Sequence, residues 1–209
     1  MNTVKEKLNY IDKQTTVKKK QIVINKTDDE YIKNELILRS KYIGINDFFP
    51  TPYSVCEIIR DQIPLEWKPN GDYKILEPSA GTGNICDCLL ELFPNWKKEI
   101  FDCCEINDDF VCLLKSKGYN VIGNDCIDIS GSYYNAVIMN PPFKLWKEHL
   151  LHCLSLLKDQ GILVCILPNS VLKYEDMLEN LNAEWFKFDG DEFKYSGANV
   201  QNIMLIIRK

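Results

Sequence analysis

The four residues Asn140-Pro141-Pro142-Phe143 follow directly on the apolar run 134–139 and could act together on a planar amino group. Each proline lacks a backbone N–H and has a fixed φ, so an extended strand cannot continue through the pair. The chain therefore stops rigidly, leaving an amide side chain, carbonyl groups and an aromatic ring at the rim of a sheet. The side-chain oxygen of Asn140 and the carbonyl oxygen of Pro141 could accept both N–H bonds of an amine while Phe143 stacks on the attached ring.

The chemistry that such a pair of acceptors supports is attack by an exocyclic amine. An amine attached to an aromatic ring is a poor nucleophile because its lone pair is delocalised into the ring. Two acceptors on one side would draw the nitrogen toward tetrahedral geometry and turn its lone pair toward an electrophile. This is catalysis by positioning and by electrostatic stabilisation of the charge that develops on nitrogen. It requires no strong base, a role that the neutral amide of Asn140 could not fill.

A glycine-rich segment, Glu-Pro-Ser-Ala-Gly-Thr-Gly-Asn at residues 77–84, follows a predicted strand and opens a predicted helix. Gly81 and Gly83 would let the backbone turn and approach a ligand without a Cβ in the way. In open α/β sheets, loops after the strands line the ligand crevice. A dinucleotide-binding turn is the alternative, but it needs a third glycine where Cys86 stands, and Glu77 would repel a pyrophosphate. An acidic mouth suits a cationic cofactor, which we expect to contact Glu77, Ser79, Ala80, Gly81 and Gly83.

Two further carboxylates stand directly after predicted strands. Glu105 ends the second strand, where an acidic side chain can accept both hydroxyl groups of a ribose. Asp125 follows the third strand and could accept a hydrogen bond from the exocyclic amine of a cofactor adenine. Cys126 or Ile127 would then lie against the adenine ring.

Together these segments resemble the motifs of class I S-adenosylmethionine (SAM)-dependent amino-methyltransferases, above all those that act on adenine N6 in DNA. Residues 140–143 resemble catalytic motif IV, residues 77–84 resemble motif I, and Glu105 and Asp125 stand where motifs II and III do. The resemblance covers residues 48–209. It implies SAM as cofactor, S-adenosyl-L-homocysteine as product and a flipped-out base as substrate. It also implies a Rossmann-like seven-stranded sheet, mostly parallel, with a C-terminal antiparallel hairpin.

The segment Phe49-Pro50-Thr51-Pro52 resembles motif X of the same family, which covers the methionine end of SAM. The resemblance places Thr51 and Pro52 in the cofactor pocket and Asn140 beside both cofactor and substrate. Taken by themselves, these residues also suit a plain helix start. Thr51 would be the N-cap and Pro52 the first helical residue.

The pattern of apolar residues from position 73 onward favours the same fold. Predicted strands and helices alternate, which is typical of a parallel, doubly wound α/β sheet. The last two strands are joined without a helix and should pair antiparallel. The predicted strands are Tyr73–Glu77, Glu99–Glu105, Asn120–Asn124, Tyr134–Met139, Gly161–Leu167, Trp185–Phe188 and Ile203–Arg208, and the predicted helices of this domain are Asn84–Phe93, Asp108–Lys117 and Trp146–Lys158.

Residues 1–47 are interpreted as an N-terminal extension ahead of a methyltransferase domain at residues 48–209. The extension holds a predicted accessory helix over Asp28–Tyr42. Residues 1–26 contain seven lysines against two acidic residues, and this basic segment could contact phosphates or be a solvated tail. Many DNA enzymes with this motif order carry a target-recognition domain after the final strand. Here recognition would come from the extension, from the aromatic-bearing loop Asp191–Asn199 or from a protein partner.

The composition argues against a membrane, export or metal-binding protein. No apolar stretch approaches the roughly 20 residues of a membrane span, and the N-terminus lacks an apolar signal core, so we expect a cytoplasmic protein. The nine cysteines lack the Cys-x-x-Cys spacing of zinc sites, and both histidines, His149 and His152, fall in one predicted helix. We therefore expect reduced, structural cysteines and no metal site.

Several functions stay open at this point. Methylation of adenine N6 in DNA is the leading hypothesis. The same chemistry could act on an adenine in RNA or on a protein glutamine amide, which presents the same planar amino group. A non-catalytic methyltransferase-like subunit is the alternative of a different class. Its mark would be a damaged motif I or IV, and both are intact here.

Overall fold

The computed structural model describes residues 48–64, 73–131, 133–188, 193 and 201–209. The predicted accessory helix over Asp28–Tyr42 and the basic segment at residues 1–26 lie outside the described residues. So does most of the loop at residues 191–199, of which Phe193 is described and buried.

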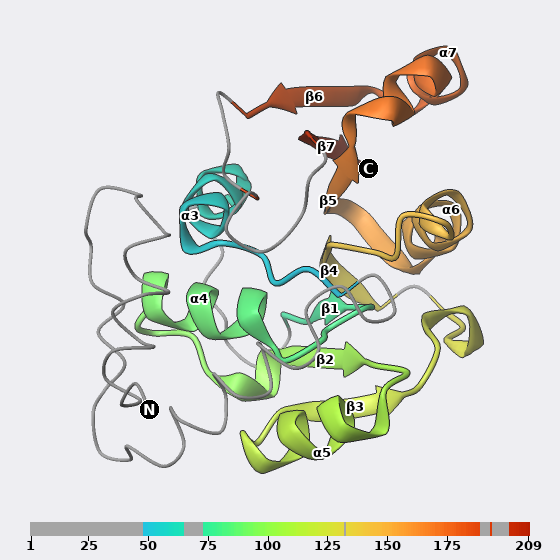
Figure 1. Ribbon diagram of the computed structural model, residues 1–209. Helices are drawn as coiled ribbons and strands as arrows, with labels where there is room; N and C mark the ends of the chain where they lie inside the picture. The colour runs from blue at the N-terminus through green and yellow to red at the C-terminus, as the bar shows by residue number, and fades with distance from the viewer. Residues whose placement is uncertain (1–47, 65–72, 132, 189–192, 194–200) are drawn as a thin grey trace, which may run out of the picture.

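A seven-stranded sheet in the order β3-β2-β1-β4-β5-β7-β6 forms the centre of the molecule (Figure 1). All neighbours from β3 to β5 pair in parallel, whereas β7 pairs antiparallel with both β5 and β6. The predicted mostly parallel sheet with an antiparallel C-terminal hairpin is therefore confirmed. The strands are β1 (Ile75–Glu77), β2 (Phe101–Cys104), β3 (Asn120–Gly123), β4 (Tyr134–Met139), β5 (Leu157–Pro168), β6 (Ala183–Lys187) and β7 (Asn202–Arg208).

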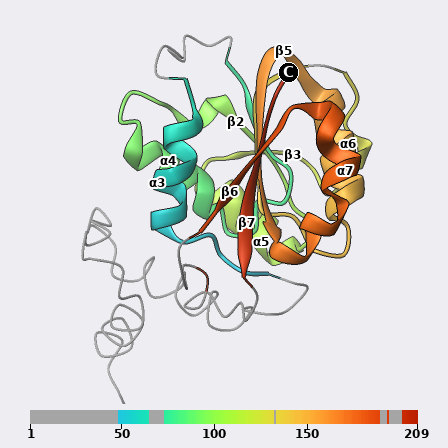
Figure 2. The same cartoon turned by 90° about the horizontal axis from the view of Figure 1, so that it is seen from above.

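Helices cover both faces of this sheet. Seen from above, α3 and α4 lie on one side of the strands and α6 and α7 lie on the other (Figure 2). The α-helices are α3 (Tyr53–Gln62), α4 (Asn84–Leu92), α5 (Asp108–Ser116), α6 (Trp146–Leu156) and α7 (Glu175–Leu178), and the short 3-10 helices are Lys98–Ile100, Cys126–Asp128, Asn169–Tyr174 and Glu179–Leu181.

The apolar core is split into two by the sheet, because successive side chains of a strand point to opposite faces. In β4, Ala136 and Ile138 belong to the cluster that also contains the buried residues of α3 and α4. Val137 and Met139 belong to the cluster that contains the buried residues of α6. Both faces of the central strands are thus covered, as near-continuous apolar strands in a parallel sheet require.

The structure corrects several predicted boundaries. The N-cap of α3 is Pro52, not Thr51, and the Thr51 hydroxyl makes no helix-capping bond. The second strand begins at Phe101 because the preceding residues form a 3-10 helix. The strand β5 begins at Leu157, so α6 ends at Leu156. The helical residues between β5 and β6 were not predicted.

The parallel strands all end at one edge of the sheet, and the strand order changes direction between β1 and β4. The connection after β1 leads outward to β2, whereas β4 lies on the other side of β1. Ligands of open α/β sheets bind at such a switch point, outside the carboxyl ends of the strands. Among the described residues, no helix combines the length and apolar character needed to cross a membrane.

Candidate functional site

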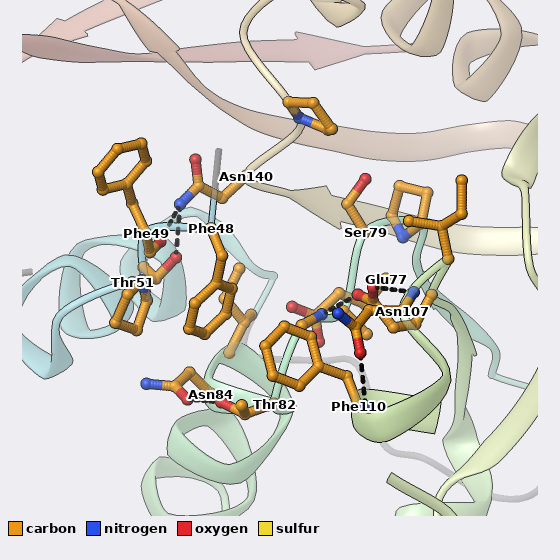
Figure 3. A pocket seen from close by; sticks show the side chains of 18 of the residues that line it. Phe48, Phe49, Thr51, Glu77, Ser79, Thr82, Asn84, Asn107, Phe110 and Asn140 are labelled. Atoms are coloured by element: carbon orange, nitrogen blue, oxygen red, sulfur yellow. Dashed lines mark hydrogen bonds between the residues drawn. The ribbon is translucent and has the colours of Figure 1, made fainter. Parts of the chain in front are cut away.

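A pocket lies at the carboxyl ends of β1, β2, β3 and β4, beneath the segment that precedes α3 (Figure 3). Residues that are far apart in the sequence line this pocket, because the loops that follow these strands all lie at the same edge of the sheet. Most of the predicted cofactor residues line it, but Pro52 and Gly83 do not. The predicted residues that line it are Thr51, Glu77, Ser79, Ala80, Gly81, Glu105, Asp125 and Asn140.

The glycine-rich loop forms one wall of this pocket. Gly81 has a φ of +54° and Gly83 a φ of +83°, which side chains rarely tolerate. A Cβ on Gly81 would lie 2.5 Å from the Phe48 ring, and one on Gly83 would lie 2.9 Å from Leu114 Cδ2. Gly83 therefore serves the packing behind the loop, as the N-cap of α4. Gly81 brings the backbone close to the pocket.

Glu105 ties the glycine-rich loop to the next loop. Its Oε2 accepts a hydrogen bond from the Gly81 N–H at 2.6 Å, and its Oε1 accepts one from the Asn107 N–H at 2.8 Å. Burial raises the pKa of this carboxyl, and the backbone donors oppose the shift. A carboxylate has about four lone-pair positions, so both oxygens retain acceptor capacity toward a ligand. The structure thus brings the predicted motif I and motif II residues together.

Glu77 lines the pocket but is recessed in its wall, with only 3% of its surface exposed. The expected acidic mouth is wrong in this respect. The Cys86 thiol donates to Glu77 Oε2 at 2.7 Å. Burial raises the pKa of Glu77 to about 8 despite that hydrogen bond.

Asp125 lies at the opposite end of the pocket, after β3. Its side chain is exposed and Oδ1 accepts from the Ile127 N–H at 3.0 Å, which begins the short 3-10 helix. Two buried residues lie beside it, Cys126 and His149, the latter from α6. Hydrogen bonding with Cys153 and with His149 lowers the pKa of Cys126 to about 5, whereas burial opposes this shift. The same Cys126 contact raises the pKa of His149.

Asn140 is held by the segment that precedes α3 (Figure 3). Its Nδ2 donates to the Phe49 carbonyl oxygen at 2.9 Å and to Thr51 Oγ1 at 3.2 Å. A carbonyl oxygen can only accept, so this contact fixes which end of the amide is the NH₂ group. The two hydrogen bonds therefore use the Nδ2 end of the amide and leave Oδ1, the predicted acceptor, outside them.

The other residues of the predicted catalytic motif lie around this amide. Pro142 lines the pocket, whereas Pro141 is buried. The half-buried Phe143 ring faces Phe49, with ring centroids 6.5 Å apart and an angle of 20° between the ring planes. Residues 140–143 thus combine an oriented amide with an aromatic face.

Sequence reasoning missed part of the lining. Asn107 carried a detectable signal, since an asparagine before Asp108 suits an N-cap, and its Oδ1 accepts from the N–H groups of Asp109 and Phe110. The remaining lining residues that were not predicted reach the pocket only through the fold, and no local sequence pattern indicates them. The lining residues that were not predicted as site residues include Phe48, Ile106, Asn107, Phe110, Asn124, Leu145 and His149.

The sequence is similar to that of the modification methylase CviBIII from Paramecium bursaria Chlorella virus NC1A, at 29% identity over 122 residues. The matched stretch is 47% of this chain and 32% of the methylase, so the chain spans about a third of that relative's length. No protein-family model matches the sequence. The two proteins are homologous over the matched stretch.

Solved structures with the same architecture include a Listeria monocytogenes protein assigned to the class I SAM-dependent methyltransferases. Its TM-score is 0.63 at 17% identity, covering 86% of this chain and 67% of that one. The methyltransferase subunit of a type I restriction-modification system from Streptococcus thermophilus has a TM-score of 0.63 at 18% identity, covering 85% and 48%. The type IIG restriction endonuclease BpuSI has a TM-score of 0.61 at 17% identity, covering 84% of this chain and 27% of that one. The chain has the class I methyltransferase fold.

Proposed function

We propose that this chain, homologous over 122 residues to a modification methylase, transfers a methyl group from SAM to the exocyclic N6 of adenine in DNA. The transfer is direct and in line, to a base flipped out of the duplex. The observation that carries the proposal is the amide of Asn140, whose NH₂ group is bound by Phe49 and Thr51 so that its oxygen is free to accept.

The pocket residues fit SAM. Bound SAM supplies an electrophilic methyl group on a cationic sulfur. The Gly81 backbone approaches the ligand where a side chain could not, and Glu105 lies beside it with acceptor capacity for ribose hydroxyls. Asp125 offers its carboxylate to an adenine amine at the far end. Glu77 also lines the pocket, and a cationic ligand would favour its ionised form.

Asn140 Oδ1 and the Pro141 carbonyl would accept both N–H bonds of the target amine. The amine nitrogen then gains tetrahedral character, and the positive charge that develops on it during transfer is stabilised by the two oxygens. The methylated nitrogen loses its proton readily to solvent, so no strong base is needed. The Thr51 and Phe49 contacts hold the amide in place beforehand, which reduces reorganisation during the reaction.

Phe143 supports a nucleobase as substrate. A base that reaches Asn140 would meet the aromatic face of Phe143, and stacking of this kind contributes roughly 1–3 kcal/mol per base. That offsets part of the few kcal/mol that flipping a base out of a duplex costs. Lys144 and Lys147 follow directly and are exposed, so their charges suit backbone phosphates. Target recognition would come from residues 1–47, from the loop at residues 191–199 or from a protein partner.

The proposal is tested by incubating the full chain with methyl-labelled SAM and, in parallel, unmethylated DNA, structured RNA and candidate proteins. Label in DNA, recovered as N6-methyladenine after digestion, is the expected result. Label that appears in RNA alone would assign the same chemistry to an RNA adenine. Label that appears in protein alone would contradict the nucleic-acid substrate and favour a glutamine amide.

The Asn140→Ala variant should lose transfer while its SAM affinity stays within a few-fold of wild type, because Oδ1 acts on the substrate. Phe143→Ala should chiefly raise the KM for DNA. Asn95→Ala, at an exposed position outside the pocket lining, is the matched control and should behave as wild type. Equal loss of transfer and SAM binding in Asn140→Ala would instead make Asn140 mainly a cofactor ligand.

A further inference from the structure

Three side chains of different chemistry meet at one end of the pocket. A carboxylate oxygen of Asp125, the Cys126 sulfur and a ring nitrogen of His149 all lie within 4.8 Å of one another. Asp125 and Cys126 come from the end of β3 and the 3-10 helix after it, whereas His149 comes from α6. Only the packing of α6 against that 3-10 helix brings them together.

The histidine of this cluster has an unmet hydrogen-bonding capacity. His149 is only 7% exposed, and its Nδ1 has no hydrogen-bond partner among the described residues. A buried polar atom without a partner costs free energy, so such atoms are rare in folded proteins unless a water or ion serves them. His152, on the same helix, contrasts with it because its Nε2 lies 3.0 Å from the Ile129 carbonyl oxygen.

We propose that Asp125, Cys126 and His149 form a binding site for a zinc-type divalent cation. Thiolate, imidazole and carboxylate are the three donor types that zinc prefers, and three protein ligands with one open position are a common zinc arrangement. Neighbouring ligand atoms of a tetrahedral zinc ion lie about 3.5 Å apart. Starting from at most 4.8 Å, each pair of ligand atoms therefore needs to close by about 1.3 Å at most. Asp125 and His149 both line the pocket.

A second group of possible ligands shows by contrast what distinguishes this site. Glu77, Cys86 and Cys103 also lie close together, but all three are buried. The Cys86 thiol already donates to the Glu77 carboxyl at 2.7 Å and lies 3.9 Å from the Cys103 sulfur. The donors of that cluster satisfy one another. At the proposed site, by contrast, Nδ1 of the buried His149 has no hydrogen-bond partner among the described residues. The proposed site departs from the expected structural role of the cysteines only at Cys126.

The metal site has a consequence that rests on the proposed function. Asp125 is also the expected acceptor for the adenine amine of SAM, so the ion and the cofactor would use the same carboxylate. Zinc and SAM should then exclude one another, each weakening the binding of the other by the same factor. The site would make the enzyme sensitive to free zinc.

The test is a titration of the metal-free, reduced full chain with Zn²⁺ and with Co²⁺ in the absence of SAM. One equivalent of Co²⁺ should give the absorption bands of tetrahedral coordination and a near-ultraviolet charge-transfer band from a Co–thiolate bond. Cys126→Ser should remove the charge-transfer band, and His149→Ala should weaken metal binding by more than about tenfold. Asp125→Asn, at an exposed position, should weaken metal binding similarly.

The chain supplies matched controls. Cys112 is an exposed free cysteine and His152 lies on the same helix as His149, so Cys112→Ser and His152→Ala should bind metal as wild type does. Unchanged metal affinity in the Asp125 and Cys126 variants would overturn the site. Because these titrations need neither SAM nor DNA, they can succeed even if methyl transfer is not observed. Zinc binding that leaves SAM affinity unchanged would overturn only the competition.

Discussion

At the residue scale, the proposed methyl transfer depends on the orientation of one amide. An asparagine with its NH₂ group facing the substrate would repel an amine, whereas one with its oxygen facing it accepts the N–H bonds. The Phe49 carbonyl settles this choice because it cannot donate, and Thr51 supplies the second acceptor for the same NH₂ group. Thr51 is 4% exposed, so this contact is shielded from water. We therefore assign Thr51 a positioning role, in addition to the predicted contact with SAM.

The residue-scale prediction concerns this hydroxyl. Thr51→Val keeps the side-chain shape but removes the acceptor for Asn140 Nδ2, at a cost of about 1 kcal/mol. We expect kcat to fall several-fold while SAM affinity changes little, because the loss is expressed when the amine is aligned. Thr51→Ser retains the hydroxyl and should recover most of the rate. Steady-state kinetics and calorimetric SAM titration would check this, and a loss confined to SAM affinity would refute the positioning role.

At the element scale, the glycine-rich loop is fixed from behind by α5. Lys117, just after that helix, has a side chain that is 2% exposed. Its Nζ donates to the Thr82 carbonyl oxygen at 2.8 Å and to Asp87 Oδ2 at 2.6 Å, and Tyr119 donates to the other oxygen of Asp87. One buried cation thus connects the loop, the helix α4 that follows it and the end of α5.

Lys117→Met should weaken both the fold and the support of the glycine-rich loop. Removing the ammonium leaves the Thr82 carbonyl and one Asp87 oxygen without their buried donor, which costs about 1–3 kcal/mol. We expect a lower free energy of unfolding in urea and weaker SAM binding, because the loop loses its support. Lys115→Met, at an exposed position two residues earlier, is the matched control. Wild-type SAM affinity in Lys117→Met would mean that the loop keeps its shape without this bond.

Local patterns predicted most elements of the fold, and the failures have identifiable physical causes. Strand β4 was predicted with its observed limits because an apolar run ends at two prolines. Thr51 has the residue type of an N-cap, but its hydroxyl accepts from Asn140, 89 residues away. The pairing of Cys126 with His149 likewise depends on how α6 packs. Contacts between distant residues leave no periodic signal in the sequence, so they could not be predicted from it.

At the scale of the whole molecule, the division into an extension at residues 1–47 and a methyltransferase domain at residues 48–209 stays a prediction. The chain spans about a third of the modification methylase to which it is homologous. The described residues hold the cofactor pocket and the candidate catalytic motif together on one sheet. Methyl transfer and target selection are therefore proposed to depend on different parts of the chain or on a partner.

The pH dependence of overall stability should report on Glu77. Its pKa is about 8 in the folded protein and near 4.5 when exposed, so the folded state binds the proton more tightly. The stability that this group contributes is therefore complete below about pH 4.5 and is lost as the pH rises toward 8. The free energy of unfolding of wild type, relative to Glu77→Gln, should fall by at most about 1.4 kcal/mol per pH unit across that window. Parallel pH profiles in urea unfolding would contradict this.

The ring of Phe48 belongs to a segment that contacts two parts of the pocket wall. It rests over Gly81, where even a methyl group would collide with it, and its centroid lies 4.8 Å from that of Phe110. Pro50 and Thr51 lie two and three residues after Phe48 in the same segment. The Phe49 carbonyl lies between Phe48 and these two residues. One short segment therefore packs against the glycine-rich loop through Phe48 and holds the Asn140 amide through Phe49 and Thr51.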